Sequence, residues 1–109
     1  MEINDFSTML ASLGQETRLE IFRTLIRAGS NGLSAGELSS ALNIAPPTQS
    51  FHLKAMVHAG LIAQRREGRQ LLYAPDYGAT RQMIDFLLTD CCDGDKRLCG
   101  PYIVETKTA

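Results

Sequence analysis

Three cysteines carry the most reactive side chains of this sequence, and they lie close together. Cys91, Cys92 and Cys99 are the 3 cysteines of the 109-residue chain, and no histidine stands near them. Thiolates favour soft, thiophilic ions. As(III) and Sb(III) take three such ligands in a pyramid that the lone pair of the ion completes. We therefore expect one As(III) or Sb(III) ion per subunit at these thiols, and no organic cofactor.

The same thiols are compatible with two other kinds of chemistry. Asp93 or Asp95, or a thiol of a second subunit, can add the fourth ligand that a zinc, cadmium or lead site needs. Oxidation can instead join Cys99 to Cys91 or Cys92, and cytosolic disulfides are usually sensing or catalytic. The residues alone leave these alternatives open.

The thiols follow a predicted helix over residues 77–90. Its apolar face is wider than the cover of one small core requires, because it includes Met83, Ile84, Phe86, Leu87 and Leu88. A chain of this length buries limited surface alone, so a dimer is a natural source of additional core. We expect residues 1–92 to form one domain and residues 93–109 to form a flexible tail that completes the thiol site.

Two further helices are predicted ahead of the middle of the chain. The first has an apolar stripe with helical spacing, formed by Phe6, Met9, Leu10 and Leu13. The second begins at Thr17 and has Gly29 as its expected C-cap.

A helix-turn-helix unit is predicted next. Ser34 and Glu37 have the S-x-x-E spacing of a capping box, which predicts a short helix. Pro46 and Pro47 suit the entrance of a second helix, and Gly60 suits its end.

A charged β-hairpin follows this unit. Its strands are expected at residues 61–65 and 70–74, with a turn at 66–69. The expected fold is therefore mainly α with a β-hairpin wing, a winged helix-turn-helix in the order α-α-α-α-β-β-α.

Basic charge gathers in this middle part. The whole chain has a net charge of −1, yet residues 46–75 hold four basic side chains against one acidic one. A localised cationic face suits an anionic partner such as DNA. On the second helix of the unit, Gln can pair with adenine and an exposed Phe can touch thymine methyls, while Lys and Arg suit phosphates. The expected contacts to double-stranded DNA are Pro47, Thr48, Gln49, Ser50, Phe51, His52, Lys54, Arg65, Arg66 and Arg69.

These motifs resemble the ArsR/SmtB family of winged-helix repressors. The resemblance covers residues from about Leu10 to Tyr73 and is carried by LASLGQETRLEIFRTL, TQSFHLKAMVHAGLI and RREGRQLLY. It implies a homodimer that holds operator DNA until an inducer binds. It also implies dimerisation through the first and last helices, by way of Phe6, Met9, Leu10, Leu13, Met83, Ile84 and Leu87.

Departures from the family pattern bear on the inducer. Arsenic sensors of the best-known type carry L-C-V-C-D-L where this chain has Leu33-Ser34-Ala35-Gly36-Glu37-Leu38, and zinc sensors carry ligands on a last helix that here has no histidine. Some relatives sense arsenite with C-terminal cysteines instead, an adjacent pair plus a third. The resemblance therefore implies As(III) or Sb(III) binding at Cys91, Cys92 and Cys99, with release of the operator.

Other classes of protein fit the sequence poorly. No C-x-x-C on a βαβ pattern, Ser-His-Asp set or paired carboxylates stand out, so we expect no enzyme. No run approaches 18 apolar residues and the N-terminus lacks signal-peptide features, so we expect a cytoplasmic protein without membrane contact.

Overall fold

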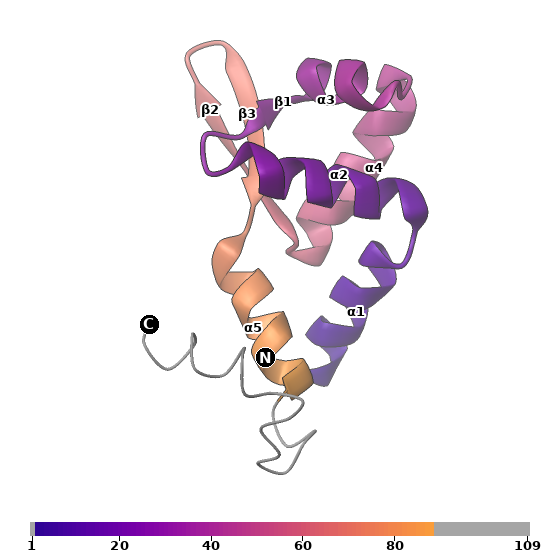
Figure 1. Cartoon of the computed structure of the whole chain (residues 1–109), viewed down its shortest axis with the longest axis vertical. Helices are drawn as coiled ribbons and strands as arrows, with labels where there is room; N and C mark the ends of the chain where they lie inside the picture. Colours follow the sequence, from indigo (N-terminus) through magenta and orange to yellow (C-terminus); the bar gives the residue numbers. More distant parts are fainter. Residues whose placement is uncertain (1, 89–109) are drawn as a thin grey trace.

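A computed structural model describes residues 2–88 of the chain. Figure 1 shows the helix-turn-helix unit and the hairpin at one end of the molecule, with the first and last helices at the other. The elements in chain order are α1 (Ile3–Leu13), α2 (Glu16–Ala28), β1 (Leu33–Ser34), α3 (Ala35–Leu42), α4 (Pro46–Ala59), β2 (Ile62–Glu67), β3 (Gln70–Pro75) and α5 (Tyr77–Leu88). This is the predicted winged helix-turn-helix, with one short strand added.

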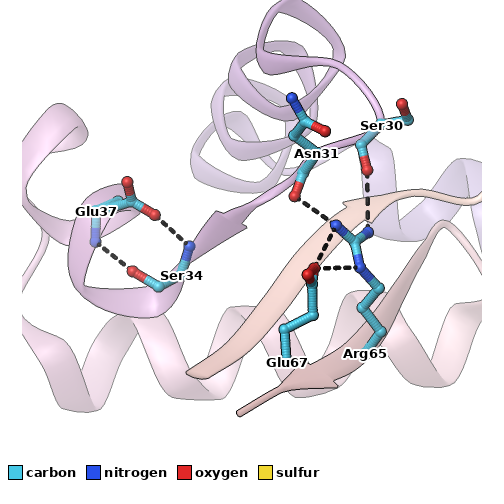
Figure 2. A network of polar contacts seen from close by, with 6 residues as sticks. All are labelled: Ser30, Asn31, Ser34, Glu37, Arg65 and Glu67. Atoms are coloured by element: carbon cyan, nitrogen blue, oxygen red, sulfur yellow. Dashed lines mark hydrogen bonds and ion pairs between the residues drawn. The ribbon is translucent and has the colours of Figure 1, made fainter. Parts of the chain in front are cut away.

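The predicted capping box opens α3. The Ser34 hydroxyl accepts a hydrogen bond from the Glu37 backbone N–H at 3.1 Å, and the Glu37 carboxylate accepts one from the Ser34 N–H at 2.8 Å (Figure 2). These two bonds satisfy N–H groups that have no partner inside the helix. Asn43 ends α3 in the left-handed region, with φ 55°.

The next helix, α4, has the predicted boundaries. Pro46 and Pro47 occupy its first turn, where a missing N–H costs nothing. Gly60 ends it with φ 84°, and its N–H bonds to the last carbonyls of the helix. A turn of three residues, 43–45, separates α3 from α4, so the two helices form a compact pair.

The sheet has three antiparallel strands in the order β1-β3-β2. The hairpin is tighter than predicted, because β2 runs to Glu67 and β3 starts at Gln70. Gly68 makes this possible with φ 62°, a sign that glycine adopts freely in two-residue hairpin turns.

Strand β1 was not predicted. It has only two residues, paired as Leu33 with Tyr73 and Ser34 with Leu72, too few to show an alternating pattern. Gly32 precedes it with φ 79°, and a Cβ there would lie 2.7 Å from the Tyr73 carbonyl oxygen. A glycine is therefore required for β1 to approach β3.

The core draws on all five helices described within residues 2–88 and on the hairpin. Its fully buried members include Ile21 and Leu25 of α2, Leu38 of α3, and Leu53 and Met56 of α4. Met9 and Met83 are also buried in this core, which corrects their predicted place in a dimer interface. Helical spacing predicts only that these side chains pack against apolar groups. In the structure those groups belong to the core of the same chain.

No helix within residues 2–88 is long and apolar enough to cross a membrane.

Candidate nucleic-acid interface

The first turns of α4 present a polar and aromatic outer face. Phe51 is 65% exposed, a large value for a phenylalanine. Of the other residues predicted to contact DNA on this helix, four are also exposed: Pro47, Thr48, Ser50 and Lys54. We call these five residues the α4 outer face. Figure 1 shows that α4 begins at the same end of the molecule as the hairpin tip.

Gln49 does not belong to this face. Its side chain is fully buried, and its Nε2 donates a hydrogen bond to the Ala35 carbonyl at 3.2 Å. The bond joins the start of α4 to the start of α3. The expectation that Gln49 reads bases is therefore wrong for this structure, because its amide is directed into the helix-turn-helix interior.

His52 is likewise turned inward, only 8% exposed. Its Nδ1 accepts a hydrogen bond from Arg18 Nε of α2 at 3.2 Å. Burial, and secondarily the charge of Arg18, lower the pKa of His52 below its ordinary value. The ring is thus a neutral packing group that holds α4 against α2, and the prediction that His52 contacts DNA is wrong for this structure.

The three wing arginines have different surroundings. Arg65 binds the carbonyls of Ser30 and Asn31 and the carboxylate of Glu67 (Figure 2). Arg66 and Arg69 are exposed, and within residues 2–88 no hydrogen bond or ion pair engages their side chains. Two of the three wing arginines are therefore available to phosphate, and the third is occupied within the protein.

The predicted dimerisation residues lie at the opposite end. Phe6 and Leu13 are half-buried, and the Phe6 ring packs against Phe86 of α5 with centroids 4.4 Å apart. Large apolar side chains remain exposed on both helices. The aliphatic ones are Ile3 and Leu10 of α1 with Ile84 and Leu87 of α5, and we call these four the α1–α5 apolar surface.

Ile3 was missed by the sequence analysis. It is 71% exposed, more than any other large apolar residue within residues 2–88. Its spacing signal was present, because it stands three residues before Phe6 and extends the same stripe.

The three cysteines Cys91, Cys92 and Cys99 lie outside the described residues, as does the predicted boundary between residues 1–92 and 93–109. Within residues 2–88 no group of three or more His, Cys, Asp or Glu side chains could hold a metal ion. The described part of α5 ends at Leu88, three positions before Cys91.

Comparison with known proteins supports the interpretation of the fold. The helix-turn-helix domain family matches residues 13–65. An uncharacterized HTH-type transcriptional regulator, YceK of Bacillus subtilis, is 43% identical over 58 residues, which cover 53% of this chain and 57% of that protein. The chain thus spans little more than half of that relative.

Two other relatives align over most of their length. The transcriptional activator HlyU of Vibrio cholerae is 31% identical, with 81% of this chain and 79% of HlyU covered. A solved HlyU structure has a TM-score of 0.65 at 32% identity, covering 84% of this chain and 99% of that one. The biofilm growth-associated repressor of Xylella fastidiosa is 28% identical, with 86% of this chain and 80% of the repressor covered.

These relatives are DNA-binding regulators of transcription rather than enzymes, and the solved HlyU structure shares the overall fold of this chain. By sequence and by fold, the chain belongs to the same family of winged helix-turn-helix transcriptional regulators as HlyU.

Proposed function

We propose that this regulator is a repressor that binds operator DNA as a homodimer and releases it when As(III) or Sb(III) binds its C-terminal thiols. The observation that carries the DNA-binding part is the exposed α4 outer face, on a helix that begins at the end of the molecule where the hairpin tip lies. The unengaged cations Arg66 and Arg69 belong to that hairpin.

The α4 outer face suits the major groove. A recognition helix presents its first turns to base edges, and here those turns expose Thr48, Ser50 and Phe51. The hydroxyls can bond to several base edges, and the phenyl ring offers apolar contact to thymine methyls. Lys54, Arg66 and Arg69 supply charge to the phosphates, which gives affinity without sequence preference.

The α1–α5 apolar surface suits a second copy of the chain. Its four exposed side chains are large and apolar, and water is a poor environment for a patch of that kind. A symmetric pairing would bury it and place two α4 helices for successive major grooves, about 34 Å apart.

The test of DNA binding uses duplexes selected from a random pool by the protein itself. Lys54→Ala is expected to weaken binding and to lower the slope of log K against log salt by about 0.9. Gln49→Ala is expected to act through folding stability, because its side chain is buried. Failure of the wild-type protein to enrich any sequence would reject the proposal.

The inducer assignment rests on ligand number and position. Three thiolates fit As(III) or Sb(III), and they follow α5, half of the proposed dimer contact. An ion bound there can change how α5 packs in the dimer and so change the affinity for DNA. The coupling free energy between two such sites is typically about 1–3 kcal/mol. Arsenite is expected to weaken operator binding by the wild-type protein but not by a variant with all three cysteines changed to serine.

Thiol redox sensing is the second candidate, and cadmium, lead or zinc sensing is the third. Redox sensing is favoured by a similar solved structure, that of reduced HlyU from Vibrio cholerae, which is 30% identical with a TM-score of 0.63. Titration of the reduced protein with arsenite, cadmium and zinc, read by ultraviolet sulfur-to-ion absorption, separates the metals. Loss of operator binding after mild oxidation without any ion would instead favour the redox mechanism.

A further inference from the structure

We infer that Arg65 is a positioning residue of the wing, which holds the hairpin against the loop between α2 and β1 and does not contact phosphate. This inference rests on the proposed DNA binding, and it divides the three wing arginines into one internal clamp and two contacts to DNA.

The guanidinium of Arg65 is engaged on three sides. Its two terminal nitrogens donate to the Ser30 carbonyl at 2.9 Å and to the Asn31 carbonyl at 2.7 Å, and its Nε donates to Glu67 at 3.0 Å. The nitrogen bound to Asn31 also lies 3.0 Å from the Glu67 carboxylate. Figure 2 shows the planar group between the loop and the strand. Few donors remain for a phosphate, and the neighbouring carboxylate offsets the charge.

Sheet order explains why such a clamp is useful. Strand β2 is separated from β1 by β3, so its backbone pairs with β3 alone. The Arg65 side chain nevertheless bonds to Ser30 and Asn31, in the loop that leads into β1. It thereby fastens the outer strand of the wing to the body of the protein.

The loop that receives Arg65 is itself fixed. Gly32 bonds back to the Gly29 carbonyl at 3.1 Å and approaches the Tyr73 carbonyl too closely for any side chain. Strand β1 then pairs with β3. The carbonyls of Ser30 and Asn31 are therefore held in place by the sheet. Through their hydrogen bonds to Arg65, they can fix the orientation of β2.

The geometry of a β-strand separates the clamp role of Arg65 from the proposed DNA contact of Arg66. Successive side chains of a strand point to opposite faces. Arg65 and Glu67 share the face toward the loop, whereas Arg66 lies on the other face and is exposed. Arg69 sits in the turn, beyond the reach of this clamp.

Replacement by lysine separates a clamp from a phosphate contact. A phosphate accepts lysine as a point charge, but lysine cannot reproduce the planar fork that serves three acceptors. We expect Arg65→Lys and Arg65→Ala to weaken binding to a selected duplex by similar factors, about threefold to tenfold, with an unchanged salt slope. Arg66→Ala and Arg69→Ala should each flatten that slope by about 0.9.

The opposite pattern would overturn the inference. If Arg65→Lys binds like the wild-type protein while Arg65→Ala flattens the salt slope, Arg65 contacts phosphate. An Arg65→Ala variant that binds DNA with unchanged affinity would also overturn it.

A second measurement needs no DNA. Amide hydrogen exchange over residues 62–75 of the free protein should accelerate in both Arg65 variants and stay at the wild-type rate in Arg66→Ala. Unchanged exchange in all three would disprove the clamp. If the wild-type protein binds no duplex, the proposed function fails, and the exchange experiment still decides whether the clamp exists.

Discussion

The two ends of this molecule expose different kinds of side chain. The end formed by α4 and the wing exposes Lys54, Arg66, Arg69 and a single large apolar residue, Phe51. The end formed by α1 and α5 exposes Ile3, Leu10, Ile84 and Leu87. The first set suits a charged, hydrated partner and the second suits an apolar one. The contrast teaches that one chain presents two exposed surfaces of different chemistry, and we propose a different partner molecule for each.

The largest effect is expected at the apolar end. Leu87→Glu places a charge in the proposed dimer contact and should yield monomers. Loss of the second recognition helix should then weaken operator binding about 100-fold or more, because the two half-sites no longer act together. Sedimentation velocity and fluorescence anisotropy measure the two effects.

A matched control for this change lies on α2. Leu19 is 44% exposed but lies outside the α1–α5 apolar surface, so Leu19→Glu should leave the protein dimeric. Equal dissociation by both variants would mean that the dimer contact has been misplaced.

A smaller effect is expected from the backbone that supports the reading end. Gly32→Ala forces a side chain into the left-handed region and against the Tyr73 carbonyl. The free energy of unfolding should fall by about 2 kcal/mol. Urea denaturation measures it.

Gly36→Ala is the comparison for this variant. Gly36 is helical, and the nearest atom to a Cβ there is the Ser34 hydroxyl at 3.9 Å. This change should be neutral or stabilise the protein by about 0.5 kcal/mol. A Gly32→Ala protein as stable as the Gly36→Ala protein would show that β1 can approach β3 by another route.

The apolar residue of the reading end gives a subtler test. If Phe51 touches a thymine methyl, replacing that thymine by deoxyuridine should weaken binding about fourfold, since one methyl group contributes about 0.8 kcal/mol. The Phe51→Ala protein should not distinguish the two duplexes. Anisotropy titrations of both proteins with both duplexes give the four affinities that this comparison needs. If both proteins lose the same affinity on replacement of the thymine, Phe51 does not contact its methyl group.

The smallest effect concerns pH. The pKa of His52 is lowered in the folded protein, chiefly by burial, so the folded state favours the neutral ring. His52 therefore contributes stability that is fully present above the unfolded pKa of about 6.5 and is lost as the pH falls from that value through the lower pKa of the folded protein. His52→Asn should flatten the dependence of the urea midpoint on pH between about 5 and 7. A slope as steep as that of the wild-type protein would assign the effect to another group.

Local sequence signals predicted the elements well. The capping box of Ser34 and Glu37 and the glycine after α4 act within a few residues, so their spacing suffices to place helix boundaries. The same signals could not predict β1, because its pairing depends on Tyr73, some forty positions away.

Signals about surfaces were less complete. Gln49 and His52 stand near the edge of the buried face of α4, and only the positions of Ala35 and Arg18 decide that both turn inward. Arg65 has the same side chain as Arg66, yet its carbonyl partners lie 34 and 35 positions earlier in the chain. Residue type gave the charge correctly, but contacts distant in sequence determine whether that charge is available.

The inward turn of Gln49 and His52 has a consequence for operator choice. In the proposed dimer, each subunit is left with few hydrogen-bonding groups that can reach base edges, so we expect a single half-site to be distinguished from random DNA only weakly. Discrimination must then come from having two half-sites in phase on one side of the duplex. An insertion of about five base pairs between them, half a helical turn, should harm recognition more than most single-base changes.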